Sequence, residues 1–240
     1  MKQEVIYGVR PVIEALRSPR REVFEVLEAA GIAEVAEAAA ASGVPVQRVD
    51  RARIGELANG GVHQGIVARV GPYQYSGLDE ILAAPDPLVL VLDGVTDPRN
   101  LGAILRAADG AGASGVVIPK DRAAGVTAAA VKASAGASEH ARVARETNLR
   151  RAIDRMKKSG LWVYAAEGEA EREGGTPYYA LDLTGPVALV LGSEGRGIRR
   201  LVREGCDGAV SIPMLGAVGS LNVSVAAAIL LYEARRQRGW

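Results

Sequence analysis

Residues 93–108 (DGVTDPRNLGAILRAA) place an asparagine and an arginine where an apolar run gives way to a loop and then to a helix. Asp97 is of the type that caps helix N-termini, so Asn100 and Arg106 are expected on one helix. Taken alone, the segment is most simply a capped helix with Arg106 as an exposed surface residue. Gly102 costs about 1 kcal/mol of helix stability relative to alanine, and we expect it to leave space beside Arg106 for a ligand.

Two later segments also carry polar residues where strands end. Residues 187–198 (VALVLGSEGRGI) run from an apolar strand into a turn with three glycines, which lets a backbone approach a ligand closely. Glu194 lies in this turn and is expected in the first turn of the next helix, where a carboxylate is favourable. Residues 210–236 pass from a strand through a glycine-bearing loop into the last helix, for which Ser220 is the expected N-cap. Asn222 begins that helix in a chain with only four asparagines.

Residues 110–115 (GAGASG) match the glycine pattern of dinucleotide-binding proteins. That chemistry needs a strand before the glycines and a helix after them, so that phosphates meet a helix N-terminus. Here a helix precedes the glycines and the strand of residues 115–119 follows. We therefore interpret them as a helix C-terminus and a tight turn, which argues against a nicotinamide-dependent oxidoreductase.

Composition excludes several other classes of protein. The 240 residues carry a net charge of +1, and 48% are hydrophobic, which is typical of a globular protein rather than a disordered one. The only cysteine is Cys206, and the only histidines are His63 and His140, so we expect no disulfide and no metal site. No run of about 18 apolar residues or signal peptide is present, which predicts a cytoplasmic protein without a membrane partner.

The pattern of elements predicts an α/β fold in two parts. Residues 1–72 are expected to form a small α/β domain, with helices over 5–17, 22–43 and 52–59 and strands over 44–49 and 61–70. Residues 73–87 are rich in Pro and Gly, which is typical of a linker. Apolar strands alternate with helices over residues 88–240, so this part is expected to be a mostly parallel sheet. All three polar segments lie in it.

The three segments together resemble motifs of the SpoU family of RNA ribose 2′-O-methyltransferases, within the SPOUT superfamily. The matching motifs are NLGAILR (100–106), LGSEGRG (191–197) and IPMLGAVGSLNVS (212–224). Residues 6–16 (IYGVRPVIEAL) and 63–68 (HQGIVA) are similar to the substrate-binding domain of the bacterial branch that methylates a guanosine of 23S rRNA. The segment between Pro19 and Val46 is shorter than in that branch, so one strand of the small domain is expected to be reduced.

This resemblance implies a C-terminal trefoil knot, a homodimer and S-adenosylmethionine as the cofactor. It implies cofactor contacts at Gly192, Ile212 and Leu221. It implies a catalytic set made of Asn100, Arg106, Glu194, Ser220 and Asn222. The last helix carries an apolar stripe, Val225, Ala228, Ile229 and Tyr232, which fits either a dimer interface or core packing.

Methyl transfer to a ribose hydroxyl needs alignment and removal of the 2′-OH proton. Because a guanidinium does not readily deprotonate, Arg106 is expected to bind a phosphate and stabilise the developing alkoxide, with a role as base left open. Glu194 could accept the proton or orient Arg106 or Asn100. Ser220 and Asn222 would position the ribose or their loop. Further RNA contacts are expected from Arg150, Arg151, Arg155, Lys157, Lys158, Arg196, Arg199, Arg200 and Arg203.

Three alternatives to 23S rRNA methylation stay open at this point. The same chemistry could act on tRNA, or on an rRNA adenosine as in antibiotic-resistance relatives. The chain could also be a non-catalytic RNA-binding or ribosome-assembly protein of the same fold.

Overall fold

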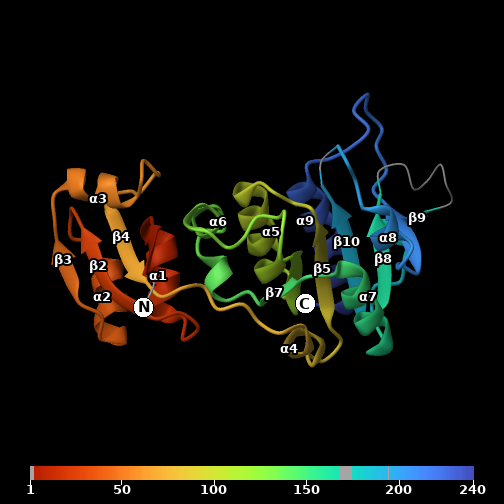
Figure 1. Cartoon of the computed structure of the whole chain (residues 1–240), viewed down its shortest axis with the longest axis horizontal. Helices are drawn as coiled ribbons and strands as arrows, with labels where there is room; N and C mark the ends of the chain where they lie inside the picture. Colours follow the sequence, from red (N-terminus) through yellow and green to blue (C-terminus); the bar gives the residue numbers. More distant parts are fainter. Residues whose placement is uncertain (1–2, 168–174, 194) are drawn as a thin grey trace.

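The computed structural model describes residues 3–167, 175–193 and 195–240, and it contains two separate β-sheets. The N-terminal unit, residues 4–70, holds a four-stranded sheet in the order β1-β4-β2-β3. The C-terminal unit, residues 88–238, holds a seven-stranded sheet in the order β7-β6-β5-β10-β8-β11-β9. Figure 1 shows the two units side by side, joined by a segment that carries the short helix α4 (Leu78–Leu82).

The N-terminal unit is a mixed sheet covered by helices. Its elements are β1 (Glu4–Tyr7), α1 (Val9–Arg17), β2 (Val23–Glu28), α2 (Ala33–Ser42), β3 (Val46–Arg48), α3 (Arg51–Leu57) and β4 (Ile66–Val70). Strand β4 pairs antiparallel with both β1 and β2, and β2 pairs parallel with β3. Strand β3 has only three residues, in line with the expected reduction of one strand.

The helices predicted over residues 5–17 and 22–43 begin later than expected, because a strand occupies the first residues of each range. Residues 4–7 form β1, and Gly8, with φ +101°, separates this strand from the helix. Residues 23–28 form β2, although their local pattern favours a helix. Val26 and Leu27 are buried in the sheet, and pairing with β4 outweighs the local preference.

The C-terminal unit is a parallel sheet, as predicted, and helices cover both of its faces. Its strands are β5 (Leu88–Asp93), β6 (Gly115–Pro119), β7 (Val143–Glu146), β8 (Trp162–Ala166), β9 (Thr176–Pro177), β10 (Val187–Gly192) and β11 (Gly208–Ser211). Its helices are α5 (Pro98–Gly110), α6 (Ala128–Ala133), α7 (Leu149–Lys158), α8 (Arg200–Arg203) and α9 (Val223–Arg238). Two 3₁₀ turns, η1 (Ala137–Glu139) and η2 (Tyr178–Ala180), complete the unit.

Side chains of the central strands alternate between two cores. Leu88, Leu90 and Leu92 of β5 pack in a core with α5, α6 and α9, whereas Val89 and Val91 pack in another with α4, α7 and α8. This arrangement explains why β5 is apolar at almost every position. The strand order brings the carboxyl ends of β5, β8, β10 and β11 to one edge of the sheet, the upper edge in Figure 1.

Both predicted ends of helix α5 are confirmed. The side chain of Asp97 accepts a hydrogen bond from the Arg99 backbone N–H at 2.8 Å and caps α5. Helix α5 ends at Gly110 and β6 begins at Gly115, so residues 110–115 form a turn from helix to strand, as expected. No helix in the described ranges is both long enough and apolar enough to cross a membrane.

Candidate active site

A pocket of about 590 Å³ opens where β8, β10 and β11 end. Its walls are the ends of these strands, the turn after β10, the segment between β11 and α9, and the first turn of α9. Four of the predicted site residues line it: Gly192, Ile212, Ser220 and Leu221. The fold thus brings the second and third motif segments to one cavity, although about 20 residues separate them in the chain.

The turn after β10 is closed by its own backbone. Ser193 and Gly197 exchange two backbone hydrogen bonds, of 3.2 and 2.9 Å. A Cβ at Gly192 would overlap the carbonyl group of Gly197 and the backbone nitrogen of Ile198. Only glycine therefore lets the turn fold back over the strand end that lines the pocket.

A buried carboxylate, which the sequence reading did not identify, holds the far end of this turn. Asp93 is the last residue of β5 and is 1% exposed. Its two carboxylate oxygens accept hydrogen bonds from the backbone N–H and the Nε of Arg199, each at 2.7 Å. The sequence did contain a signal for this contact, namely an acidic residue at the end of an otherwise apolar strand. A carboxylate buried there needs a hydrogen-bonding or charged partner.

The first and third motif segments meet through their asparagines. Asn222 donates a hydrogen bond from Nδ2 to Oδ1 of Asn100 at 3.1 Å, which links the start of α9 to the first turn of α5. The Oδ1 atom of Asn222 also accepts from the Ser224 backbone N–H at 2.9 Å, so Asn222 is the N-cap of α9. The prediction that Ser220 caps this helix was wrong, because the helix begins at Val223 and Ser220 lies in the segment that lines the pocket.

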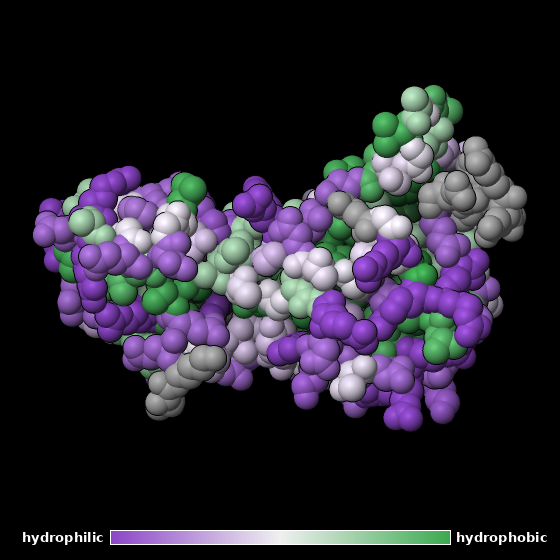
Figure 2. Space-filling view, turned by 45° about the horizontal axis from the view of Figure 1, so that its top comes forward, coloured by the Kyte–Doolittle hydropathy of each residue, from purple (hydrophilic) through white to green (hydrophobic). Residues whose placement is uncertain are grey.

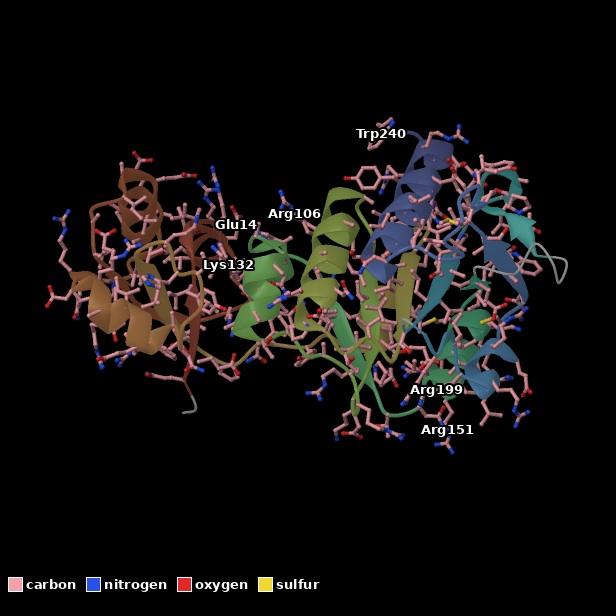
Figure 3. All side chains as sticks on the ribbon, turned by 90° about the horizontal axis from the view of Figure 1, so that it is seen from above. Glu14, Arg106, Lys132, Arg151, Arg199 and Trp240 are labelled. Atoms are coloured by element: carbon pink, nitrogen blue, oxygen red, sulfur yellow. The ribbon has the colours of Figure 1, made fainter. Side chains whose placement is uncertain are left out.

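Arg106 lies two turns further along α5 and is exposed. No hydrogen bond or ion pair joins its guanidinium to any residue in the described part of the chain. Figure 3 shows its side chain pointing out of the molecule beside α6, on the α5 side of the sheet. The charge is therefore available to an anionic ligand.

Gly102 does not leave space for a ligand, contrary to the expectation. A Cβ at this position would lie 2.5 Å from the Ala130 carbonyl oxygen and 2.5 Å from the Cβ of Ala133. The glycine permits close packing of α5 on α6 instead. Gly102 therefore helps to set the position of α5, the helix that bears Arg106, and does not open a path to it.

Glu194 lies outside the described residues, so its predicted role is neither supported nor opposed by the geometry. The following helix, α8, begins only at Arg200.

Most of the cations proposed to contact RNA have acidic partners. Arg150 pairs with Asp154, Arg155 with Asp79 and Glu146, Lys157 with Asp207, Arg199 with Asp93, Arg200 with Glu204, and Arg203 with Glu167. Figure 3 shows Arg151 and Arg199 on the opposite side of the molecule from Arg106. RNA contact by this group stays a prediction.

The segment between β11 and α9 projects beyond the body of the protein. Leu215 in this segment is fully exposed and Val218 is 68% exposed, and Figure 2 shows an apolar tip there. Exposed apolar patches of this kind mark surfaces that contact a partner or a ligand. Other residues of the same segment, such as Met214 and Ser220, line the pocket, so a molecule bound at the tip would lie close to the pocket.

Comparison with known proteins agrees with this geometry. Residues 87–232 match the model of the SpoU rRNA methylase family, and residues 5–76 match that of the RNA 2′-O ribose methyltransferase substrate-binding domain. The chain is 46% identical over 244 residues to the 23S rRNA (guanosine-2′-O-)-methyltransferase RlmB of Escherichia coli, covering 98% of this chain and 99% of that one. It is 45% identical over 245 residues to RlmB of Pseudomonas putida, covering 98% and 97%.

Among solved structures, the SpoU methyltransferase AviRb from Streptomyces viridochromogenes, in complex with the cofactor AdoMet, superposes with a TM-score of 0.83. The identity is 27%, and the match covers 98% of this chain and 90% of AviRb. A family match over more than half of the chain, near-complete coverage of the relatives and the same fold lead to one conclusion. The chain belongs to the SpoU rRNA methylase family.

Proposed function

We propose that this protein transfers a methyl group from S-adenosylmethionine to the ribose 2′-hydroxyl of a guanosine in 23S rRNA. The observation that carries the proposal is the pocket lined by Gly192, Ile212, Ser220 and Leu221. A hydrogen bond between Asn222 and Asn100 connects the helix beside this pocket, α9, to the helix that bears Arg106, α5. The choice of a 23S rRNA guanosine rests on the RlmB relatives, which match nearly the whole chain.

The pocket residues fit a nucleoside-like cofactor. A volume of about 590 Å³ lies within the range of small-ligand sites. Its walls combine apolar side chains such as Met214, Leu221 and Val223 with polar groups at Ser193 and Ser220. Residues 214–220 form no backbone hydrogen bonds with other described residues, so their N–H and C=O groups are available to a ligand. When bound, S-adenosylmethionine supplies the electrophilic methyl group.

The side chains of this protein would align the ribose and manage charge. Arg106 offers five N–H donors and no acceptor, which suits it to bind the phosphate next to the target ribose and to stabilise negative charge on the 2′-oxygen. The bonded pair Asn100 and Asn222 would hold the sugar or fix the start of α9. Glu194 remains the candidate to accept the hydroxyl proton or to orient Arg106 or Asn100.

The rest of the molecule completes the proposal. Residues 1–72 would bind the RNA, residues 73–87 would link the parts, and residues 88–240 would carry catalysis. The C-terminal unit would contain the trefoil knot implied by the family resemblance. The enzyme would act as a homodimer, in the cytoplasm, where ribosomal RNA is processed.

The test is methyl transfer from labelled S-adenosylmethionine to unmodified transcripts of 23S rRNA, 16S rRNA and tRNA, followed by digestion to nucleosides. We expect label in 2′-O-methylguanosine, and only with the 23S transcript. Label in tRNA, in 2′-O-methyladenosine or in a modified base would contradict the proposal, as would binding of the cofactor without transfer to any transcript.

A further inference from the structure

The contact between the two units is built around a buried ion pair. The Nη1 atom of Arg21, just before β2, lies 3.0 Å from Oε1 of Glu139 in η1, and the two side chains are 2% and 1% exposed. Arg21 also donates from Nε to the Gly71 carbonyl at 2.9 Å and pairs with Glu4 at 2.5 Å. Removing two charges from water is costly, so such a pair persists only where both partners are held in a fixed geometry.

Separate segments of the N-terminal unit support this pair. Gln64, in the turn before β4, accepts a hydrogen bond on Oε1 from Nζ of Lys132 in α6 at 2.6 Å and another from the Val9 backbone N–H at 3.2 Å. Ser18 donates from Oγ to the carbonyl of Glu139 at 2.7 Å. Two regions of the N-terminal unit, the connection between α1 and β2 and the turn before β4, therefore bond to the short stretch from α6 to η1.

Backbone packing leaves little freedom between the units. Gly136, between α6 and η1, has φ +92°, and a Cβ there would lie 2.7 Å from Cβ of Glu14 in α1. The Tyr73 hydroxyl, from the segment after β4, lies 3.1 Å from the carbonyl oxygens of both Ser138 and Ala141. The segment that joins the units is thus itself attached to the C-terminal unit.

The stretch from α6 to η1 also supports α5, the helix that bears Arg106. Helix α6 packs against α5 at Gly102, and η1 also contacts α5. Figure 3 shows Glu14, Lys132 and Arg106 close together along one side of the molecule, from α1, α6 and α5 in turn. A continuous series of packed elements therefore runs from the N-terminal unit to Arg106.

We propose that Arg21 and Glu139 are positioning residues that hold the N-terminal unit at a fixed orientation to Arg106 and so determine which ribose of the bound RNA is methylated. This inference rests on the proposed function. A flexible tether would not need a buried pair, since exposed ion pairs contribute little to stability. The exposed pair Arg53 and Glu56 within α3 is an example of the latter kind.

The ion pair offers a double-variant test. Arg21→Met leaves the buried carboxylate of Glu139 without its partner, and Glu139→Met leaves the buried guanidinium with the partly exposed Glu4 as its acidic partner. The double variant removes both charges and keeps similar volumes, a change that buried pairs often tolerate. Burial raises the pKa of Glu139 above its ordinary value despite Arg21, because it removes the carboxylate from water. Glu56→Gln is the control.

The measurements are the maximum dimension by small-angle X-ray scattering, calorimetric affinity for S-adenosylmethionine, kcat/KM with 23S rRNA, and the mapped positions of 2′-O-methylation. For each single variant we expect a larger maximum dimension, kcat/KM at least tenfold lower and methylation at additional riboses. Cofactor affinity should stay within twofold, which shows that the C-terminal unit is folded. The double variant should recover the wild-type dimension and the single position, and Glu56→Gln should match wild type throughout.

Single variants that keep the wild-type dimension and position would overturn the inference. So would expanded variants that still methylate one position with the wild-type kcat/KM, because the contact would then have no positioning role. Failure of the wild-type protein to methylate any transcript would instead contradict the proposed function, and the scattering comparison would still report on the contact itself.

Discussion

At the scale of single residues, the candidate site contains two asparagines that bond to each other and an arginine that is open to solvent. Asn100 and Asn222 bond to each other and fix two helix starts, so their amides are partly committed to structure. Arg106 differs, because its guanidinium is exposed and makes no hydrogen bond or ion pair with the described part of the chain. A charge held on a packed helix and left open to solvent is suited to an anionic group in the transition state.

Replacement of Arg106 by alanine tests this division. We expect single-turnover methyl transfer at saturating RNA to fall by about 100- to 1,000-fold, the typical effect of losing one charge stabiliser. Affinity for S-adenosylmethionine should stay unchanged, because Arg106 does not line the pocket. Arg142→Ala, at an exposed arginine that pairs with Glu80 and is not among the expected RNA contacts, is the control. A normal rate for Arg106→Ala would leave Glu194 as the main catalytic candidate.

Replacement of Asp93 gives a second test at the scale of single residues. Asp93→Asn keeps the size of the side chain but removes the charge that binds both the backbone and Nε of Arg199. A hydrogen bond to a charged group contributes about 1.5–3 kcal/mol, so we expect the free energy of unfolding to fall by an amount of that order, measured by thermal unfolding. We also expect weaker binding of S-adenosylmethionine, measured by calorimetry. Glu204→Gln removes an exposed pair with Arg200 and should change neither quantity. Equal behaviour of the two variants would show that Asp93 does not hold the turn.

At the scale of elements, the parallel sheet was the easiest part to predict from sequence. Its strands are buried on both faces, so they appear as continuous apolar runs such as residues 88–92. The N-terminal unit was harder to predict, because residues 22–43 are rich in Ala and Glu and favour helix throughout. Only pairing with β4, distant in the sequence, makes residues 23–28 a strand.

The same contrast holds for the site. Residues of the last two motifs could be placed together because each follows a strand, and strands of a parallel sheet end at one edge. The role of Gly102 could not be predicted, because it depends on α6, an element about 30 residues later whose packing leaves no mark near Gly102. Asp93 was missed for a similar reason, since its partner Arg199 is more than 100 residues away.

Gly102→Ala tests the packing of α5 on α6. The added methyl group would meet backbone atoms of Ala130 and Ser134, which cannot move independently of their helix. Overpacking typically costs about 1–3 kcal/mol, so the melting temperature should fall despite the higher helix propensity of alanine. Gly185→Ala, at an exposed position where an added Cβ would meet no atom within 4 Å, should leave the melting temperature unchanged. A higher melting temperature for Gly102→Ala would show that α6 yields and that Gly102 has no packing role.

At the scale of the whole molecule, the exposed apolar groups gather on the C-terminal unit. Val225 and Tyr232 of α9 are 46% and 42% exposed, and Trp240 lies against Tyr232 with ring centroids 6.1 Å apart. The predicted stripe on the last helix is thus only partly used in the core. It is the surface that the proposed homodimer would cover.

A charge placed in this stripe should separate the dimer. We expect Val225→Asp to sediment as a monomer at concentrations where the wild-type protein is a dimer, because a buried, unpaired carboxylate is costly in an apolar interface. Val62→Asp introduces the same charge at an exposed valine of the N-terminal unit and should leave the dimer intact. If Val225→Asp remains a dimer, the interface lies elsewhere on the molecule.

The central claim is that the acceptor is a ribose 2′-oxygen of 23S rRNA. It is tested most directly with two RNAs that differ by one atom. One carries the natural guanosine at the mapped position, and the other carries 2′-deoxyguanosine there. The account predicts methyl transfer to the first RNA and none to the second, although both should bind the protein equally. Undiminished transfer to the deoxy RNA would place the methyl group on a base and contradict the account.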